Sequence, residues 1–560
     1  MTSRAQMRAA SDRFIESDGV YDLLIIGGGI TGAGAARDAA RRGLKVCLVE
    51  MDDLASGTSS RSSKLVHGGL RYLEQLEFSL VFEAVSERRI LMEIAPHLVS
   101  PLGFLFPVYA SSRRGVFTVN LGMWVYDGLS LFRSPRIHKN LSQRAVAEAE
   151  PMLNRTGLKG APLYWDCRTD DARLTLETAL DGALCGAHVL NWSKVVGLLR
   201  DEQGRVSGAR VRDLLSGEER SVKANAVINA TGPWSDHTRN MGAGTHKARL
   251  RPTKGVHIVV DAERLQVENA VVCFHPEDGR VLFAIPWGPQ TYIGTTDTDF
   301  SADPAEVAAT HEDVVYLLAA SNHYFPEAKL TEADVLSTWA GVRPLIGQED
   351  ADDESAVSRE HEIRVDPDFL ITIAGGKLTT YRRMAGEVVD RAVSLLMLAG
   401  KLPPDLREAR TDREALPGAI GWPRNDDKTK VVQSVVDAAQ GKLPEDICRY
   451  LANIYGTRGA DVAERAAKNQ RLAARLVPGR PEILAQVDHS VETELAATVR
   501  DFFIRRTQIF FRDRDQGLTA VETVAARMRE LLGWSEDAET REILAYQSEV
   551  ARSRRWQDER

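Results

Sequence analysis

The segment VYDLLIIGGGITGAGAARDAARRGLKVCLVE, residues 20–50, decides the fold of this chain. Its first apolar run is followed by a glycine-rich turn, by a stretch of alanine and arginine, and by a second apolar run. An uninterrupted apolar run is typical of a parallel strand that is covered on both faces. The segment therefore predicts a βαβ unit, in which the small residues at positions 33–36 let the helix approach the sheet closely.

A dinucleotide-binding motif lies inside this unit. Gly27, Gly29 and Gly32 form G-x-G-x-x-G between the first predicted strand and the helix, where backbone N–H groups and the helix dipole can hold a pyrophosphate. Glu50 ends the second strand, where a carboxylate can accept hydrogen bonds from both ribose hydroxyls of an adenosine. The same charge disfavours the phosphorylated adenosine of NADP. A tight packing turn is the alternative, but glycines, Glu50 and a βαβ setting together favour a dinucleotide.

The composition describes a folded chain of several domains. It has 560 residues, of which 43% are hydrophobic and 27% charged. Lysine and arginine (71) are outnumbered by aspartate and glutamate (79), which argues against a nucleic acid partner. The 5 cysteines lack a C-x-x-C pair and the 12 histidines lack an H-x-x-x-H pair, so we expect a reducing compartment and no metal site.

The beginning of the chain and its hydropathy bear on membrane contact. Residues 1–19 are polar and lack the apolar core of a signal peptide, so we expect a loose extension there. No uninterrupted run reaches the roughly 18 apolar residues that a spanning helix requires. Any contact with a membrane is therefore expected to be peripheral.

Later segments extend the first domain and add two others. Apolar runs that end in glycine at 225–232 and 369–376 predict strands that return to the first domain, whereas alternating runs at 256–260, 280–287 and 291–297 predict antiparallel strands. The expected fold class is α/β, with a Rossmann-like dinucleotide domain, an antiparallel-sheet substrate domain and an α-helical C-terminal domain. The expected boundaries are 20–100 with 180–240 and 355–400 for the first, 101–179 with 241–354 for the second, 401–418 for a linker, and 419–560 for the third.

Three further segments combine glycines with hydroxyl or cationic side chains. They are ASGTSSRSSKLVHGGLRYLE at 55–74, ATGPWS at 230–235 and AGGKLTTYRRMA at 374–385. A helix N-terminus aimed at a flavin would stabilise negative charge on the reduced ring. Each segment taken singly also fits a loop, a turn or a helix cap.

Taken together, these motifs resemble the FAD-dependent glycerol-3-phosphate dehydrogenases, respiratory enzymes that oxidise sn-glycerol 3-phosphate to dihydroxyacetone phosphate. GGGITGAGAARDAARRG, TSSRSSKLVHGGLRYLE, DDARL, NATGPW, KGVHIVV, IPW, IGTTD, GVRPL and GGKLTTYR occur in the family's order. The resemblance implies tightly but non-covalently bound FAD and electron transfer to membrane quinone. It also implies work at the cytoplasmic face of the membrane. An oxidase of the same family, which reduces oxygen, remains an alternative.

The resemblance also implies a set of cofactor-binding residues. The ADP half of FAD is expected at Gly27, Gly29, Gly32 and Glu50. Two segments are expected to approach the flavin: the first contains Thr58, Ser59 and Ser60, and the second contains Gly375, Lys377, Leu378 and Thr379. Gly232 is expected to support the cofactor from the other side.

The substrate-binding residues implied by the resemblance are Arg71, Tyr72, Arg343, Arg359 and Lys377. Arginine forks with a lysine suit a phosphate dianion, because charge-assisted hydrogen bonds are stronger than neutral ones. Arg343 has a structural alternative, since apolar residues surround it and a buried charge needs a partner.

The expected reaction transfers a hydride from substrate C2 to flavin N5 while a base accepts the hydroxyl proton. His67 and His257 are the candidate bases, because imidazole titrates near neutral pH and arginine does not release its proton. Arg343 completes the candidate catalytic set by fixing the phosphate. Either histidine also fits a hydrogen-bonded structural role.

Two segments and two other functions stay open. Residues 111–133 carry Trp124 and Tyr126 between arginines, which fits an anchor on anionic lipid or a core helix. Residues 502–511, FFIRRTQIFF, fit a core, a subunit contact in a possible homodimer, or a lipid contact. An amine or amino-acid oxidase shares the cofactor architecture, but the cationic set suits phosphate better. The alternative from another class is a flavin-binding regulator without turnover.

Overall fold

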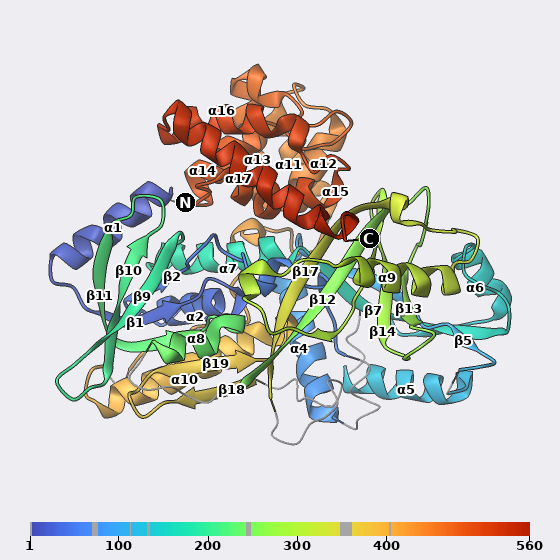
Figure 1. The fold of residues 1–560 in the computed structure, drawn as a ribbon, viewed down its shortest axis with the longest axis horizontal. Coiled ribbons are helices and arrows are strands. Elements are labelled where there is room, and N and C mark those ends of the chain that lie inside the picture. The colour runs from blue at the N-terminus through green and yellow to red at the C-terminus, as the bar shows by residue number, and fades with distance from the viewer. Residues whose placement is uncertain are drawn as a thin grey trace.

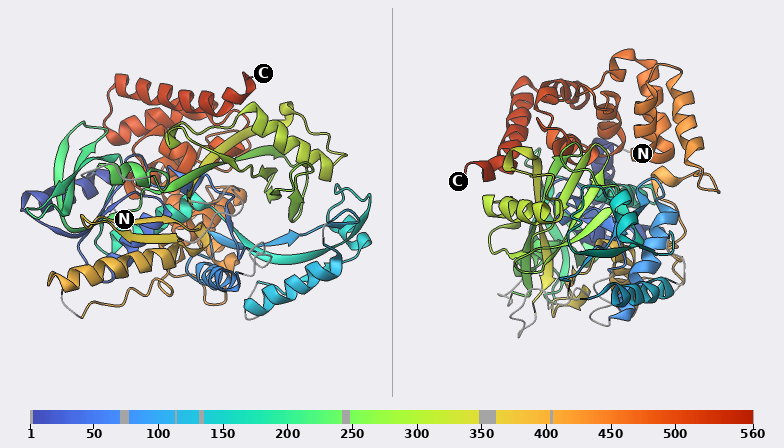
Figure 2. Two further views of the ribbon diagram at one scale, coloured as in Figure 1. Left: turned by 60° about the horizontal axis from the view of Figure 1, so that its bottom comes forward. Right: turned by 90° about the vertical axis from the view of Figure 1, so that its right-hand side faces the viewer.

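The structure, a computed structural model, describes residues 3–69, 77–112, 114–130, 135–241, 248–347, 361–402 and 405–559. Within these ranges the chain forms two sheet domains side by side, and a helical C-terminal domain lies across both of them (Figure 1). The last long helix, α17 (Glu536–Arg554), runs along the upper edge of the molecule in the left view of Figure 2.

The predicted βαβ unit is confirmed. It consists of β1 (Tyr21–Ile26), α2 (Ile30–Arg41) and β2 (Val46–Val49), and the two strands pair in parallel. Gly27 has a φ of +109°, and a Cβ placed on Gly32 would lie 1.9 Å from the Gly27 carbonyl oxygen. Only glycine therefore allows α2 to begin so close to the end of β1.

The first sheet brings separate segments of the chain together. Its order is β18 (His361–Val365), β19 (Ile371–Gly375), β11 (Glu219–Asn229), β1, β2 and β8 (His188–Leu190), with β9 (Ser193–Arg200) and β10 (Val206–Asp213) extending β11. The strands from β19 to β8 are parallel. The predicted return of the chain at 225–232 and 369–376 is thus confirmed, and the turns after β1, β11 and β19 lie at one edge of the sheet.

Helices cover the first sheet. Helix α2 packs against α7 (Asp171–Leu184) and α10 (Tyr381–Leu398). The expected division at 179/180 falls inside α7, which belongs with the first domain because its apolar face packs there.

The second sheet contains the predicted antiparallel strands. Its order is β16 (Thr298–Asp299), β12 (Leu250–Asp261), β15 (Gln290–Gly294), β14 (Val281–Trp287), β13 (Ala270–Phe274), β4 (Val99–Leu105), β7 (Leu158–Thr169) and β3 (Leu65–Val66). β17 (Val335–Ile346) pairs with β12, and β5 (Val108–Tyr109) and β6 (Lys139–Leu141) pair with β7. Helices α4 (Phe78–Ile94), α5 (Val116–Leu129), α6 (Gln143–Ala149) and α9 (His311–Tyr324) surround it (Figure 1). Residues 20–100 were expected in the first domain, but β3 pairs with β7 in the second sheet. The chain therefore crosses from the first domain to the second after residue 60.

The C-terminal domain is helical, as expected. Its helices are α11 (Lys428–Ala439), α12 (Glu445–Tyr455), α13 (Gly459–Lys468), α14 (Ala485–Thr493), α15 (Ile509–Arg512), α16 (Val521–Leu532) and α17. The segment 502–511 is buried, and Phe502, Phe503 and Ile509 lie in the core. Among its three interpretations, the structure therefore favours the core.

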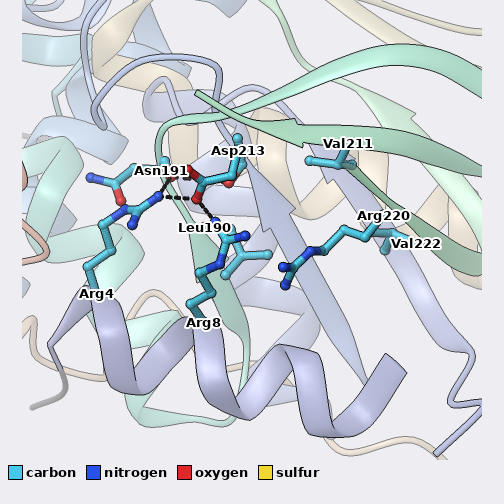
Figure 3. A pocket seen from close by; sticks show the side chains of 9 residues that line it. Arg4, Arg8, Leu190, Asn191, Val211, Asp213, Arg220 and Val222 are labelled. Atoms are coloured by element: carbon cyan, nitrogen blue, oxygen red, sulfur yellow. Dashed lines mark hydrogen bonds and ion pairs between the residues drawn. The ribbon is translucent and has the colours of Figure 1, made fainter. Parts of the chain in front are cut away.

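The N-terminal residues differ from the expected loose extension. They form helix α1 (Arg4–Glu16), which begins with a capping box between Ser3 and Gln6. Arg4 and Arg8 project from α1 onto the buried carboxylate of Asp213 (Figure 3). This ion-pair cluster fixes α1 to the first sheet, which local polarity in the sequence could not show. Among the described residues, no helix combines the length and apolar character needed to cross a membrane.

Candidate cofactor and substrate site

A cavity of about 700 Å³ opens where β1, β2, β11 and β19 end. Ligands of open parallel sheets bind at this edge, and the volume lies within the range of small-molecule pockets. Half of the predicted site residues line it: Gly27, Gly29, Glu50, Thr58, Ser59, Gly232, Gly375, Lys377 and Leu378. Turns far apart in the sequence therefore form one site.

The turn after β1 is shaped for a phosphate. A Cβ on Gly27 would lie 2.5 Å from the Ala230 carbonyl oxygen, and one on Gly29 would lie 3.2 Å from Ser59 Oγ. Gly29 precedes α2 without a capping side chain of its own, while the Ile30 N–H donates to Ser59 Oγ at 2.9 Å. Gly32 lies behind the turn and permits its close approach to the helix. The cradle fits a pyrophosphate at a helix N-terminus.

Glu50 faces the cavity from the end of β2, and its carboxylate is already partly used. Oε2 accepts a hydrogen bond from the Gly28 N–H at 2.6 Å, and Oε1 accepts one from the Asp52 N–H at 2.9 Å. Ser56 Oγ also donates a long hydrogen bond to Oε1 at 3.5 Å, so Oε2 keeps a lone pair for a further donor and Oε1 gains one when Ser56 turns away. Burial raises the pKa of Glu50 to about 7, although the two backbone donors act in the opposite direction.

The segments expected near the flavin differ in how they meet the cavity. Thr58 and Ser59 line it, and Thr58 Oγ1 donates to the Val342 carbonyl at 2.6 Å, but Ser60 is buried behind this turn. Gly375 and Gly376 have φ values of +75° and +78°, which turn the chain from β19 toward Lys377. Such consecutive left-handed residues favour glycine.

Thr379 is buried and does not line the cavity. Its hydroxyl accepts a hydrogen bond from the His67 N–H at 3.1 Å and donates one to the His67 carbonyl at 3.2 Å. Thr379 therefore fixes the backbone of a candidate base. His67 itself is half-buried.

His257 lies deeper, on β12. Its ring stacks on Trp339 with centroids 4.6 Å apart, and Nε2 lies 2.9 Å from Ser63 Oγ. Burial, with the nearby charges of Arg343 and Lys64, holds the pKa of His257 well below its usual range. The imidazole is therefore neutral near pH 7, and neither His257 nor Ser63 is among the described residues that line the cavity.

The cationic residues predicted to bind substrate differ in their position relative to the cavity. Arg343, on β17, donates to Asp297 Oδ1 at 2.9 Å and to Thr295 Oγ1 at 3.0 Å, which matches its structural alternative, while the adjacent Pro344 lines the cavity. Lys377 lines the cavity directly. Arg71, Tyr72 and Arg359 lie outside the described residues.

The structure also adds cavity residues that sequence analysis did not single out. Ser62 lines the cavity, and its hydroxyl donates to Asp171 at 2.7 Å; the same carboxylate pairs with buried Lys64 at 2.7 Å. Ser62 and Lys64 belong to the quoted motif TSSRSSKLVHGGLRYLE, and Asp171 belongs to DDARL. The motifs themselves were the available signal, whereas the contact between them appears only in the structure. Trp234, from the quoted segment ATGPWS, also lines the cavity. Other lining segments, with no local signal, are Ser193 to Val195, His237 and residues 301–305.

The parallel sheet, its glycine turns and the cavity at their edge are those of an FAD-dependent oxidoreductase. The family model described as "FAD dependent oxidoreductase" matches residues 22–382, and that of the "C-terminal domain of alpha-glycerophosphate oxidase" matches residues 409–539. At the level of fold alone, the chain is similar to glycine oxidase from Geobacillus kaustophilus, with a TM-score of 0.51 at 21% identity over 66% of this chain and 95% of that one.

Closer relatives narrow the class. The aerobic glycerol-3-phosphate dehydrogenase of Bacillus subtilis is 41% identical over 523 residues, which is 93% of each chain; that of Staphylococcus saprophyticus is 40% identical over 531 residues, 94% of each. The glycerol-3-phosphate dehydrogenase from Bacillus halodurans, solved with FAD, matches at 35% identity and a TM-score of 0.81 over 99% of this chain and 98% of that one. This chain belongs to the FAD-dependent glycerol-3-phosphate dehydrogenase family, and FAD is its cofactor.

Proposed function

We propose that this enzyme oxidises sn-glycerol 3-phosphate to dihydroxyacetone phosphate and passes the electrons to membrane quinone. The observation that carries the proposal is the meeting of the glycine turns, Glu50 and Lys377 in one cavity. Bound without a covalent link, FAD would supply the acceptor for a hydride from substrate C2 at its N5 position.

The lining residues suggest how the cofactor is held. Gly27 and Gly29 hold the pyrophosphate, and Glu50 accepts hydrogen bonds from the adenosine ribose. Thr58, Ser59 and Gly375 to Leu378 flank the flavin, and Gly232 supports it from the other side. In support, Gly232 has a φ of +53°, and a Cβ there would meet no atom within 4 Å, so this wall stays open to a ring.

The substrate is bound by charge and deprotonated by an imidazole. Lys377 and Arg343, together with Arg71, Tyr72 and Arg359 by resemblance, hold the phosphate, since guanidinium and ammonium groups bind a dianion by charge-assisted hydrogen bonds. His67 accepts the hydroxyl proton, because Thr379 fixes its backbone and it is more exposed than His257. His257 supports the site through Ser63.

An apolar surface on α4 and α5 is proposed as the membrane contact at the cytoplasmic face. Phe117, Leu121 and Trp124, at helical spacing on α5, are 82%, 58% and 52% exposed. Phe78 and Phe82 are exposed on α4, which packs beside α5 (Figure 1). Exposed aromatic and aliphatic side chains on one helix face favour insertion into the lipid interface, where quinone is dissolved.

An anaerobic titration tests the reaction. Adding sn-glycerol 3-phosphate to the holoenzyme should bleach the flavin absorbance and release dihydroxyacetone phosphate. Reoxidation should be fast with a soluble quinone analogue and slow with air. Fast reoxidation by oxygen would instead favour the oxidase, and a flavin spectrum that persists would favour a regulator without turnover.

A further inference from the structure

We propose that the helical C-terminal domain controls how tightly FAD is retained, because it fixes two walls of the cofactor cavity from outside. Arg505 and Arg506 are positioning residues for the wall that contains Glu50, and Arg552 is one for the wall at 301–305. The role of Arg505 and Arg506 rests on the contact between Glu50 and the adenosine ribose in the proposed function.

Two consecutive arginines of the C-terminal domain converge on one buried carboxylate of the first domain. Arg506 donates through Nη1 to Asp53 Oδ2 at 2.6 Å and through Nη2 to Asp53 Oδ1 at 2.9 Å, and Arg505 Nε donates to Asp53 Oδ2 at 2.7 Å. Arg505 also pairs with Asp501 at 2.8 Å, which balances the second positive charge. Burial alone would raise the pKa of Asp53, but the two guanidinium charges hold it below its ordinary value.

Asp53 is tied rigidly to the ribose carboxylate. The Asp52 N–H donates to Glu50 Oε1 at 2.9 Å, and the Ser193 N–H donates to the Glu50 carbonyl at 2.7 Å. Asn191 Nδ2 donates to Asp53 Oδ1 at 3.0 Å. Residues 50–53 and 191–193 therefore form one hydrogen-bonded block, with Glu50 on the cavity side and Asp53 on the side of the arginines. A shift of Asp53 must move Glu50.

The second wall is held in a similar way. Residues 301–305 line the cavity, and Asp303 accepts a hydrogen bond from Trp234 Nε1 at 3.3 Å. On the outer side of this segment, Arg552 of α17 donates to the Ala305 carbonyl oxygen. Glu549 orients Arg552 with contacts of 2.6 and 2.7 Å. One domain thus braces both walls.

The chemistry of these contacts indicates that they orient the cavity walls more than they hold the two domains together. The C-terminal domain already buries Phe502, Phe503 and Ile509 in a large apolar core. Buried ion pairs add little net stability compared with apolar packing, whereas a bidentate guanidinium fork fixes the orientation of a carboxylate. The fork at Asp53 therefore serves the geometry of the ribose wall.

A double-mutant cycle tests the first wall. FAD release from diluted holoenzyme is followed by the rise in flavin fluorescence in Arg506→Lys, Glu50→Gln and the double variant. Lysine keeps the charge but not the fork, so we expect release about tenfold faster, and a similar effect from Glu50→Gln. If Arg506 acts through Glu50, the double variant should resemble the faster single variant instead of multiplying the two effects.

A matched control and the contrary outcomes complete the test. Arg527→Lys, which breaks a two-point fork with Asp488 within the C-terminal domain at a less buried position, should release FAD at the parental rate. Release at the parental rate from Arg506→Lys, or multiplied effects in the double variant, would overturn the inference. A silent Glu50→Gln would instead refute the ribose contact of the proposed function.

Two further variants keep the test decisive. Should Arg506→Lys fail to fold, Asp53→Asn with Arg506→Gln removes both charges and leaves no buried ion unpaired, and it should still release FAD faster. For the second wall, Arg552→Ala should release FAD severalfold faster than Arg555→Ala, whose side chain is exposed at the end of the same helix. Equal rates for these two would overturn the second brace.

Discussion

Thr379 and His67 exchange two hydrogen bonds although they lie 312 positions apart: the His67 N–H donates to Thr379 Oγ1 at 3.1 Å, and the hydroxyl donates back to the His67 carbonyl at 3.2 Å. The turn that follows β19 and the segment that carries the candidate base are therefore one unit. Movement of Lys377 and Leu378 at the cavity would displace His67. The geometry of the turn after β19 is thus coupled to the backbone of the candidate base.

Replacing His67 tests its role as base. His67→Asn should slow anaerobic flavin reduction by sn-glycerol 3-phosphate about 100- to 10,000-fold, because a general base contributes rate on that scale, while FAD remains bound. Stopped-flow bleaching of the flavin measures the rate. Reduction at nearly the parental rate would remove His67 from the mechanism and leave His257, through Ser63, as the candidate.

Arg343 is expected to distinguish substrates by their charge. Arg343→Ala should lower kcat/KM for sn-glycerol 3-phosphate much more than for glycerol, since only the former carries the dianion that a guanidinium binds. Asp297→Asn serves as the control, because it breaks the ion pair at 2.9 Å but keeps the cation. Equal losses on both substrates in Arg343→Ala would show that the arginine acts only as a structural partner of Asp297.

Glu50 predicts a pH dependence of cofactor affinity. The pKa of its carboxyl in the FAD-free protein is about 7, and only the ionised form accepts both ribose hydroxyls. FAD should therefore bind more tightly as pH rises, by up to about tenfold between one unit below and one unit above this pKa. Fluorescence titration across that range measures the effect. The dependence should be lost in Glu50→Gln; a dependence unchanged in that variant would assign it to another group.

The same carboxyl should make the stability of the FAD-free protein fall as pH rises, whereas the affinity for FAD rises. Its pKa in the folded protein is raised from 4.5, so the folded state binds the proton more tightly than the unfolded state. The contribution of Glu50 to the free energy of unfolding is therefore present below about pH 4.5 and is lost as pH rises through about 7. The melting temperatures of the FAD-free protein and of Glu50→Gln should converge in the acidic part of this window. A difference between the two melting temperatures that is constant with pH would contradict this.

The apolar surface on α5 should bind lipid. Leu121→Glu together with Trp124→Glu should abolish flotation with vesicles that contain anionic phospholipid, because each substitution places a charge on the inserted face. Anaerobic bleaching by sn-glycerol 3-phosphate should persist, since neither side chain is among the described residues that line the cavity. Leu544→Glu, an exposed apolar position on α17, is the matched control and should still float. Loss of flotation in both variants would point to a general effect of charge.

Local features of the fold could be predicted from the sequence, whereas long-range contacts could not. The βαβ unit and its G-x-G-x-x-G turn follow from hydrophobic pattern and glycine spacing, and the structure confirms them. No local pattern showed that Thr379 would meet His67, or that Trp234 would reach Asp303. Such pairs depend on which strands become neighbours, and single residues carry no mark of that.

The burial of individual side chains was equally hidden. His257 was a candidate base because imidazole titrates near neutral pH, but β15 and β17 enclose it on both sides of β12. The arginines in FFIRRTQIFF were compatible with core, subunit or lipid contacts. Only the tertiary structure supplies Asp53, 453 positions from Arg506, as their partner.

The convergence of Arg505 and Arg506 on Asp53 also constrains how this enzyme can evolve. Losing one partner of such a buried cluster costs about 3–5 kcal/mol, a large part of the stability of a typical domain. Single substitutions at these positions should therefore be removed by selection. Among descendants, Asp53, Arg505 and Arg506 should be kept or replaced together. Exchange of the C-terminal domain between distant homologues should succeed only when the acid and both arginines come from the same parent.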